Sequence, residues 1–451
     1  MKALSSTDVV SINLPRRICG SAPLAARPAR ATSMALRQSA ASPECAGDPV
    51  HITPVRSGAE RDAEAPAVRL FDEIVHQAAL RRASDIHIEP LERAWRVRLR
   101  IDGQLHEVAR PSAHLREPLT CRIKLLAHLD IGERRLPQDG RLKLVRDGGS
   151  DEFRVSLLPT VHGEKVVLRR LDRLPPSLDL SALGLTPEAA LAVEQALSEP
   201  TGMILITGPT GSGKTLSLFC LLQRLNRESL NVCTVEDPPE LRLPGLNQVG
   251  VFDKAGMGFA HVLRALLRQD PDVLMIGEIR DGETADVALK AAQTGHKVLS
   301  TLHANDAPSA LLRLGDLGVA PFRLAAGVRL VTAQRLVRRL CERCKLPTAR
   351  DDASLLAAGL APQALAEDWP MYRPCGCIDC HGIGYRGRVG VHQVMPVTPL
   401  LQRLIGSRAD EQRIAEAARE SGVRSLREAA LDKVRAGLTT LDEALAATEA
   451  A

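Results

Sequence analysis

The spacing of apolar residues predicts that ordered structure begins near Val68 with a helix. Apolar side chains recur there three or four residues apart, at Val68, Phe71, Ile74, Val75 and Ala78. Two alternating stretches follow, residues 83–90 and 95–101, and alternation is typical of strands with one buried face. An Asp-Gly pair directly after the second stretch indicates a hairpin turn.

These elements predict a small α/β domain over residues 67–173. Its remaining elements are a helix over 117–128 and strands over 141–145, 153–158 and 165–169. The strand at 95–101 places arginines on one face and valine, leucine and isoleucine on the other. Pro175 and Pro176 mark residues 174–180 as a linker.

A second α/β domain is expected over residues 181–335. Buried apolar runs alternate there with helices, which is the pattern of a mostly parallel sheet. The strands are expected at 203–206, 232–235, 273–276 and 298–301. Residues 336–395 form a cysteine-bearing stretch, and helices are expected over 396–451.

Composition adds few constraints to this predicted domain organisation. A chain of 451 residues with 45% hydrophobic residues can form two or three domains with substantial cores. Aromatic residues make up 2%, so leucine, valine, isoleucine and alanine must fill those cores. No apolar run approaches the roughly 20 residues that span a bilayer. The net charge of +5 reflects 59 basic and 54 acidic residues, a balance that does not by itself predict nucleic-acid binding.

The first 66 residues differ from the rest of the chain. They are rich in alanine, serine, proline and arginine and lack apolar periodicity. An organelle transit peptide has a similar composition, but a bacterial leader or an early start codon is the favoured interpretation. The absence of a continuous apolar segment argues against a secretory signal. We therefore expect residues 1–66 to be a disordered leader.

Residues 208–215 match the phosphate-binding pattern G-x-x-x-x-G-K-[ST]. They are Gly208, Pro209, Thr210, Gly211, Ser212, Gly213, Lys214 and Thr215. An apolar strand precedes them and an amphipathic helix over 216–226 follows, which is the context that this motif requires. Glycines let backbone N–H groups surround phosphate oxygens, and the helix N-terminus adds partial positive charge. Lys214 is expected to reach the β- and γ-phosphates, and Thr215 to ligate Mg²⁺.

Carboxylates follow two of the predicted strands, and ligands of parallel sheets bind beyond the carboxyl ends of the strands. Glu236 and Glu240 follow one strand. Glu278 follows another, with Gly277 where an aspartate commonly stands in a Walker B motif. Glu278 is expected to hold Mg²⁺ through water or to polarise the attacking water. Taken alone, each carboxylate could also be a solvated turn residue.

Two histidines flank the strand at 298–301. His296 precedes the strand and His303 follows it. A histidine at a strand end beside a bound nucleotide can donate a hydrogen bond to the γ-phosphate, so both are candidate site residues. The alternative for each is a purely structural role.

Two C-x-x-C pairs indicate a metal site. The pairs are Cys341 with Cys344 and Cys377 with Cys380, and each can hold one edge of a tetrahedral Zn²⁺. The 32 residues between the pairs exceed the usual zinc-ribbon spacing. Free thiols are the alternative.

Together these motifs resemble those of the assembly ATPases of type II secretion and type IV pili. The P-loop, the acidic segment 236–240, the atypical Walker B strand and the two histidines occur in the order of that family. The likeness covers about Val68 to Ala446 and includes several shorter segments. These are residues 84–90, 98–103, 138–141, 159–165 and 267–272.

The resemblance implies a RecA-like P-loop NTPase core preceded by a small PAS-like α/β domain, with a zinc-binding insert and C-terminal helices. It implies a homohexamer that hydrolyses ATP with Mg²⁺. The implied partners are an inner-membrane platform protein and a membrane adaptor, with the ring peripheral on the cytoplasmic face of the bacterial inner membrane. Direct contact with nucleic acid is not expected. The tetracysteine insert is typical of the assembly enzymes and is missing from the retraction-type pilus ATPases.

The resemblance also implies that arginines of the first domain complete the ATP site of a neighbouring subunit. Arg98, Arg100, Arg141 and Arg154 lie in the matching segments, and Arg98 and Arg141 are the first candidates. The alternative for the arginines of residues 95–101 is a solvated strand face.

Two features of the chain depart from the family pattern. Family members commonly carry a larger N-terminal domain that docks on the adaptor, and Val391-His392-Gln393 stands where a glutamate is common.

Two other functions compete with that of an assembly ATPase. The first is a nucleic-acid motor for DNA uptake or conjugation, and the lack of a basic stripe or aromatic run argues against it. A subunit that binds ATP without turnover is the other, and the acidic segments argue against it. The sequence does not distinguish secretion from pilus assembly.

Overall fold

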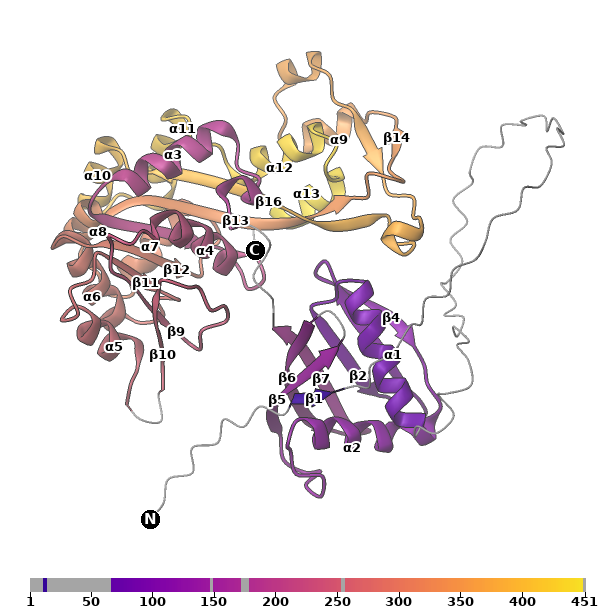
Figure 1. Ribbon diagram of the computed structural model, residues 1–451. Coiled ribbons are helices and arrows are strands. Elements are labelled where there is room, and N and C mark those ends of the chain that lie inside the picture. The colour runs from indigo at the N-terminus through magenta and orange to yellow at the C-terminus, as the bar shows by residue number, and fades with distance from the viewer. Residues whose placement is uncertain (1–10, 14–65, 147–148, 172–177, 253–255, 449–451) are drawn as a thin grey trace, which may run out of the picture. The chain divides into compact units, whose positions relative to one another are not determined.

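The computed structural model describes residues 11–13, 66–146, 149–171, 178–252 and 256–448. The chain forms two compact units that divide after residue 172 (Figure 1). Most of the predicted leader and of the predicted linker lies outside the described residues.

The first unit contains a seven-stranded sheet and two α-helices among its described residues. Its elements are α1 (Pro66–Leu80), β2 (Asp85–Pro90), β3 (Trp95–Ile101), β4 (Gln104–Ala109), α2 (Arg116–Leu126), β5 (Gln138–Arg146), β6 (Gly149–Thr160) and β7 (Gly163–Leu171). The strand order is β1-β5-β6-β7-β2-β3-β4. The strand β1 (Ser11–Asn13) lies within the segment predicted as a disordered leader and pairs in parallel with β5; the other pairs are antiparallel.

Alternation along β3 separates the core face of this sheet from its polar face. Trp95, Val97 and Leu99 are buried, whereas the arginines between them are only partly buried. The helices α1 and α2 bury Phe71 and Ile123, and α1 lies over the sheet in Figure 1. The predicted strand at 95–101 is therefore confirmed, with its arginines on the face away from the core.

The second unit is built on another seven-stranded sheet. It begins with α3 (Pro187–Ser198), β8 (Gly202–Thr207), α4 (Lys214–Leu225), β9 (Val232–Glu236), β10 (Asn247–Gly250), α5 (Phe259–Leu266), β11 (Val273–Ile276), α6 (Gly282–Gln293), β12 (Lys297–Leu302), α7 (Ala307–Asp316) and α8 (Pro321–Gly327). The strand order is β10-β9-β11-β12-β8-β13-β16, and only β13 and β16 pair antiparallel. The mostly parallel sheet predicted from the apolar runs is confirmed.

The central strands of this sheet are buried on both faces, which explains why their sequences are apolar without alternation. All six residues of β8 and all six of β12 are buried. One face packs against α5, α6, α7 and α8, and the other packs against α3 and α4. The C-terminal edge of the sheet is left for polar loops.

A long antiparallel ribbon extends this sheet past its C-terminal edge (Figure 1). Its strands are β13 (Val328–Leu340) and β16 (Tyr385–Pro396). The strand β8 pairs with β13 only as far as Ala333, whereas β16 pairs with β13 up to Leu340. Therefore β13 runs unbroken through residue 335, where the sequence predicted the end of the ATPase core. Neither strand was predicted, because polar side chains interrupt their apolar residues.

The remaining elements surround this ribbon. The segment between its strands contains β14 (Leu346–Thr348), α9 (Asp352–Ala357) and β15 (Met371–Arg373), and the ribbon is followed by α10 (Pro399–Gly406), α11 (Glu411–Glu420), α12 (Leu426–Arg435) and α13 (Leu441–Thr448). The last two helices pack against the ribbon in a cluster that includes Val337, Val391 and Leu431. None of the described helices is long and apolar enough to cross a membrane.

Candidate nucleotide site and metal centre

The P-loop connects β8 to α4 at the C-terminal edge of the sheet. Gly208, Gly211 and Gly213 have φ angles of 147°, 81° and 88°, a region that side chains with a Cβ rarely adopt. Space is also restricted, because a Cβ on Gly208 would lie 2.4 Å from the carbonyl oxygen of Gln334. Backbone conformation thus favours glycine at all three positions, and close packing against β13 also requires it at Gly208.

The loop contains groups suited to an anion. The hydroxyl of Ser212 is buried and has no hydrogen-bond partner among the residues that the structure describes. Lys214 folds back and donates to the carbonyl oxygens of Gly208 at 2.7 Å and Pro209 at 3.0 Å. An unpaired buried hydroxyl and a lysine that bonds only carbonyls both fit a phosphate ligand.

The pKa of Lys214 is lowered to about 8. Burial is the main cause, and the positive charge of Arg335 acts in the same direction, while Glu278 opposes both. The protonated form of Lys214 is therefore less favourable in this site than in water, and a bound anion would favour it.

Glu278 and His303 lie side by side at the same edge of the sheet. They follow β11 and β12, which pair in parallel, so their strand ends are adjacent. His303 Nε2 lies 3.5 Å from Glu278 Oε2, and Arg280 forms an ion pair with the same carboxylate. Arg280 also lies 3.5 Å from Asp237, which follows β9. The structure thus joins the predicted Walker B carboxylate to one of the two predicted histidines.

The two other predicted glutamates occupy different environments. Glu236 is buried at the end of β9 and accepts hydrogen bonds from Thr234 at 2.7 Å and Gln248 at 2.9 Å. Burial raises the pKa of Glu236. Glu240 is exposed in the loop beyond β9. Both hydrogen-bond partners of Glu236 lie on the paired strands β9 and β10.

The other predicted histidine, His296, lies apart from Glu278 and His303. It lies directly before β12, and its Nδ1 is 3.1 Å from the carbonyl oxygen of Ala291. The six residues of β12 lie between His296 and His303, which are therefore about 23 Å apart at 3.3 Å per strand residue. His296 is therefore at the opposite edge of the sheet from the P-loop.

Sequence reasoning missed two residues of β13 that lie beside the P-loop. Gln334 is buried, and its Oε1 accepts a hydrogen bond of 2.7 Å from Ser217 of the P-loop helix. Arg335 donates to the carbonyl oxygens of Gln334 at 3.1 Å and Asn305 at 2.8 Å. The adjacent Gln334 and Arg335 were the available signal, but that signal has meaning only once residues 328–340 are recognised as a strand next to β8.

Three of the arginines on the polar face of the first unit are held by carboxylates. Arg98 donates to Glu89 through two hydrogen bonds of 2.7 and 2.9 Å, and Arg96 donates to it at 3.0 Å. Burial alone would raise the pKa of Glu89, but hydrogen bonds from Arg98, Lys165 and Arg96 lower it to about 2. Arg100 lies 3.7 Å from Asp85. These arginines form a paired strand face instead of a solvated one.

Arg141 and Arg154 differ from that group. They are direct cross-strand partners on β5 and β6, so their side chains leave the same face. Arg154 is in turn opposite Arg169 of β7, which pairs with Asp85 at 2.8 Å. Among the described residues, Arg141 and Arg154 have no ion-pair partner within 4.0 Å.

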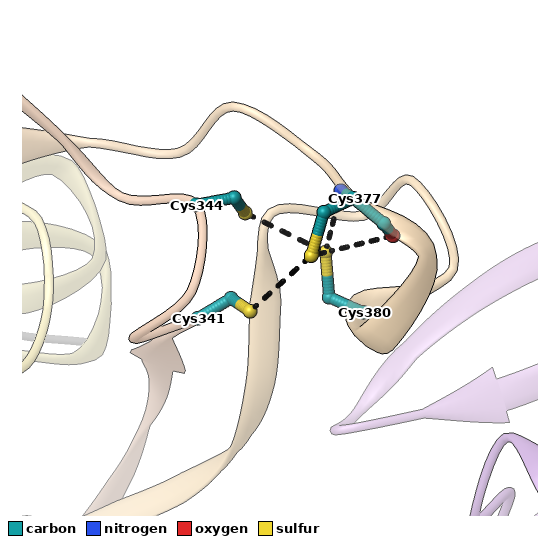
Figure 2. Close-up of side chains that lie close together, drawn as sticks. All are labelled: Cys341, Cys344, Cys377 and Cys380. Atoms are coloured by element: carbon teal, nitrogen blue, oxygen red, sulfur yellow. Dashed lines mark hydrogen bonds between the residues drawn. The ribbon is translucent and has the colours of Figure 1, made fainter. Parts of the chain in front are cut away.

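Four cysteines meet where the ribbon of β13 and β16 ends (Figure 2). Cys341 and Cys344 follow β13, while Cys377 and Cys380 lie shortly before β16. The Sγ atoms are 3.8 Å apart for Cys341–Cys377, 3.7 Å for Cys344–Cys380 and 3.7 Å for Cys377–Cys380. A tetrahedral zinc with Zn–S bonds of about 2.3 Å requires S···S separations of about 3.8 Å. The four sulfurs therefore fit one zinc ion.

Backbone amides complete this cysteine cluster. Gly376 N–H donates to Cys344 Sγ at 3.3 Å, and Gly384 N–H donates to Cys380 Sγ at 3.2 Å. Such bonds favour the thiolate form that a metal binds. Burial raises the pKa of Cys344 to about 12, so its thiolate needs a cation to balance it near neutral pH. Four thiolates leave no open position, and zinc here would be structural.

The comparisons with known proteins agree with this geometry. The family model described as type II/IV secretion system protein matches residues 60–446. The chain belongs to this family. It is 46% identical over 409 residues to the type IV pilus assembly ATPase PilB of Myxococcus xanthus, which covers 89% of this chain and 72% of that protein. It is 45% identical over 390 residues to the type II secretion system protein E of Pectobacterium carotovorum, covering 86% of this chain and 77% of that protein.

Solved structures give the same fold. The pilus retraction motor PilT with bound ADP is 25% identical, with a TM-score of 0.55 over 84% of this chain and 96% of that one. The ATPase DotB of Legionella pneumophila has a TM-score of 0.61 at 20% identity, covering 86% of this chain and 96% of that one, and supports the fold alone. The predicted family, the α/β P-loop fold and the assignment as an ATPase are thereby confirmed.

We expect nucleotide affinity to fall as the pH rises above about 8, the pKa of Lys214 in the free site. Above that pH the free lysine loses its proton, whereas bound phosphates hold it charged, so binding takes up a proton. The dissociation constant of fluorescent ADP should rise up to about tenfold per pH unit. Titrations between pH 7 and 9.5 measure this. Lys214→Arg keeps its charge, and an equally steep dependence in that variant would contradict the assignment.

Removal of the metal is expected to destabilise the end of the ribbon. Structural zinc contributes about 10 kcal/mol or more to the folding of small domains. Atomic spectroscopy of the purified protein should find one zinc per chain, lost in Cys341→Ser together with amide-exchange protection around residues 341–384. Cys375→Ser is the matched control, because Cys375 lies outside the four-cysteine cluster. Equal zinc content in both variants would refute the site.

Proposed function

We propose that this chain is the motor ATPase of a type IV pilus or type II secretion machine, and that its hydrolysis of ATP drives the addition of pilin or pseudopilin subunits. The observation that carries this proposal is the convergence of the P-loop with Glu278 and His303 at one sheet edge. The names of relatives at 46% and 45% identity support both machines equally.

The residues of the site suit phosphoryl transfer to water. Lys214 would bind the β- and γ-phosphates once it leaves the loop carbonyls, and the Thr215 hydroxyl at the start of α4 would ligate Mg²⁺. Mg²⁺ supplies neutralisation of phosphate charge. Glu278 would orient the attacking water, and His303, 3.5 Å from its carboxylate, would donate to the γ-phosphate. The products are ADP and phosphate.

The arginines that complete the site are, in this proposal, Arg141 and Arg154. A residue that stabilises the phosphates of a neighbouring subunit must have N–H groups available for them. Glu89 occupies the guanidinium of Arg98 in a bidentate contact, whereas Arg141 and Arg154 have no such partner among the described residues. This changes the order expected from the sequence, in which Arg98 and Arg141 came first.

The assembly that follows is a homohexamer in which each nucleotide lies between subunits. Its proposed site of action is the cytoplasmic face of the bacterial inner membrane, on a platform protein and with an adaptor. The name of the related pilus assembly ATPase supports an assembly role. The four-cysteine cluster also supports it, because the family resemblance links that insert to assembly and not to retraction.

Lys214→Ala is expected to abolish ATP hydrolysis and secretion or piliation. The loss follows because the lysine is the one P-loop side chain that brings positive charge to the phosphates. Phosphate release from the purified protein measures the first effect, and complementation of a deletion strain measures the second. Glu278→Gln should also stop hydrolysis but retain ATP binding. Turnover in either variant at the wild-type rate would refute the mechanism, and stimulation by DNA would favour a nucleic-acid motor.

Arg141→Gln and Arg154→Gln should each lower kcat by about 10³-fold or more, in the range of an arginine finger. Arg98→Gln should mainly lower the melting temperature, since it leaves the buried Glu89 short of a partner. Steady-state ATPase assays and thermal melts compare the three variants. A larger kcat loss in Arg98→Gln than in Arg141→Gln would reverse the assignment.

A further inference from the structure

Arg335 lies at the level of the P-loop although it is 120 residues away from it in the chain. The register of β13 against β8 pairs Ala333 with Thr207, the last residue of β8. Arg335 is two residues further along β13, level with the beginning of the P-loop. Strand alternation points its side chain to the opposite face from Gln334, which contacts the P-loop helix.

Two hydrogen bonds hold the guanidinium between the P-loop and the loop after β12. One bond, of 3.1 Å, goes to the carbonyl oxygen of Gln334, which itself abuts Gly208. The other, of 2.8 Å, goes to the carbonyl oxygen of Asn305, two residues beyond His303. A guanidinium has five N–H donors, and these bonds use two of them. Donors therefore remain for another acceptor.

No carboxylate neutralises Arg335 within 4.0 Å among the described residues. Asp306 acts on it only at longer range, and burial lowers the pKa of Arg335 without discharging it. Lys214 of the P-loop is a second cation of this site, and the positive charge of Arg335 acts to lower the pKa of Lys214. Two cations beside one loop repel each other, and an anion between them removes that cost.

We propose that Arg335 is a ligand of the terminal phosphate of ATP, contributed by the same subunit that holds the P-loop. Its free N–H groups bind a γ-phosphate oxygen, while its bond to Asn305 holds the loop that carries His303. Arg335 thus links recognition of the γ-phosphate to the position of His303 beside Glu278. This inference rests on the proposed function, in which the P-loop binds ATP.

The test separates the γ-phosphate from the rest of the nucleotide. Calorimetric titrations with AMP-PNP and with ADP, both with Mg²⁺, would be made on the wild type, Arg335→Gln and Arg335→Lys. We expect Arg335→Gln to weaken AMP-PNP about tenfold or more, as for loss of a charge-assisted hydrogen bond, and ADP less than about twofold. Arg335→Lys keeps the charge without the planar fork and should show an intermediate loss for AMP-PNP only.

Arg338→Gln is the matched control on the same strand. Arg338 is paired with Glu443 at 2.6 Å and stacked on Tyr385 at 4.0 Å, away from the P-loop. Its replacement should leave both affinities unchanged.

Equal weakening of ADP and AMP-PNP in Arg335→Gln would show that Arg335 only supports the P-loop, and no weakening would exclude any role; either result overturns the inference. If Arg335→Gln does not fold, the ratio of the AMP-PNP and ADP dissociation constants of Arg335→Lys tests the inference in its place. Failure of the wild type to bind AMP-PNP would instead overturn the proposed function.

Discussion

The parallel pairing of the central strands in the second unit is the constraint on which the site depends. Parallel strands end at one common edge, so the residues that follow β8, β11 and β12 meet there, and β13 continues past the same edge beside the P-loop. The P-loop, Glu278, His303 and Arg335 come together for this reason alone. The glycines of the loop then satisfy a second demand, since Gly208 leaves no room for a Cβ beside the Gln334 carbonyl.

The antiparallel ribbon connects the P-loop to the four-cysteine cluster. The strand β13 carries Gln334 against the P-loop helix and ends directly before Cys341. At about 3.3 Å per residue, Gln334 and the last residue of β13 are about 20 Å apart along one continuous strand. Zinc would hold the far end of the ribbon, where the helices α12 and α13 pack on it. The four cysteines therefore lie at the ends of two strands of the core sheet, while β14 and β15 between these strands form a separate two-stranded sheet.

Charge is distributed unevenly over the polar face of the first unit. Asp85 and Glu89 are buried carboxylates that together hold five cations of neighbouring strands. A buried carboxylate surrounded in this way fixes the side chains that it binds, because separating them would leave its charge unpaired. Arg154 and Arg141 lie two and three strands away from Asp85, and neither has an ion-pair partner within 4.0 Å among the described residues. The division between fixed and available arginines is thus a property of strand order.

The sequence by itself determined the P-loop with its strand and helix, the Walker B carboxylate and the two cysteine pairs, because each is a local pattern whose chemistry lies within a few residues. It also determined the parallel sheet, since apolar runs record burial on both faces. Only the tertiary structure decided that Arg98 is paired with Glu89 and that His296 and His303 lie at opposite edges of the sheet. It also decided that β13 places Arg335 beside the P-loop. These facts depend on register between strands distant in the chain, and register arises from packing that no local pattern specifies.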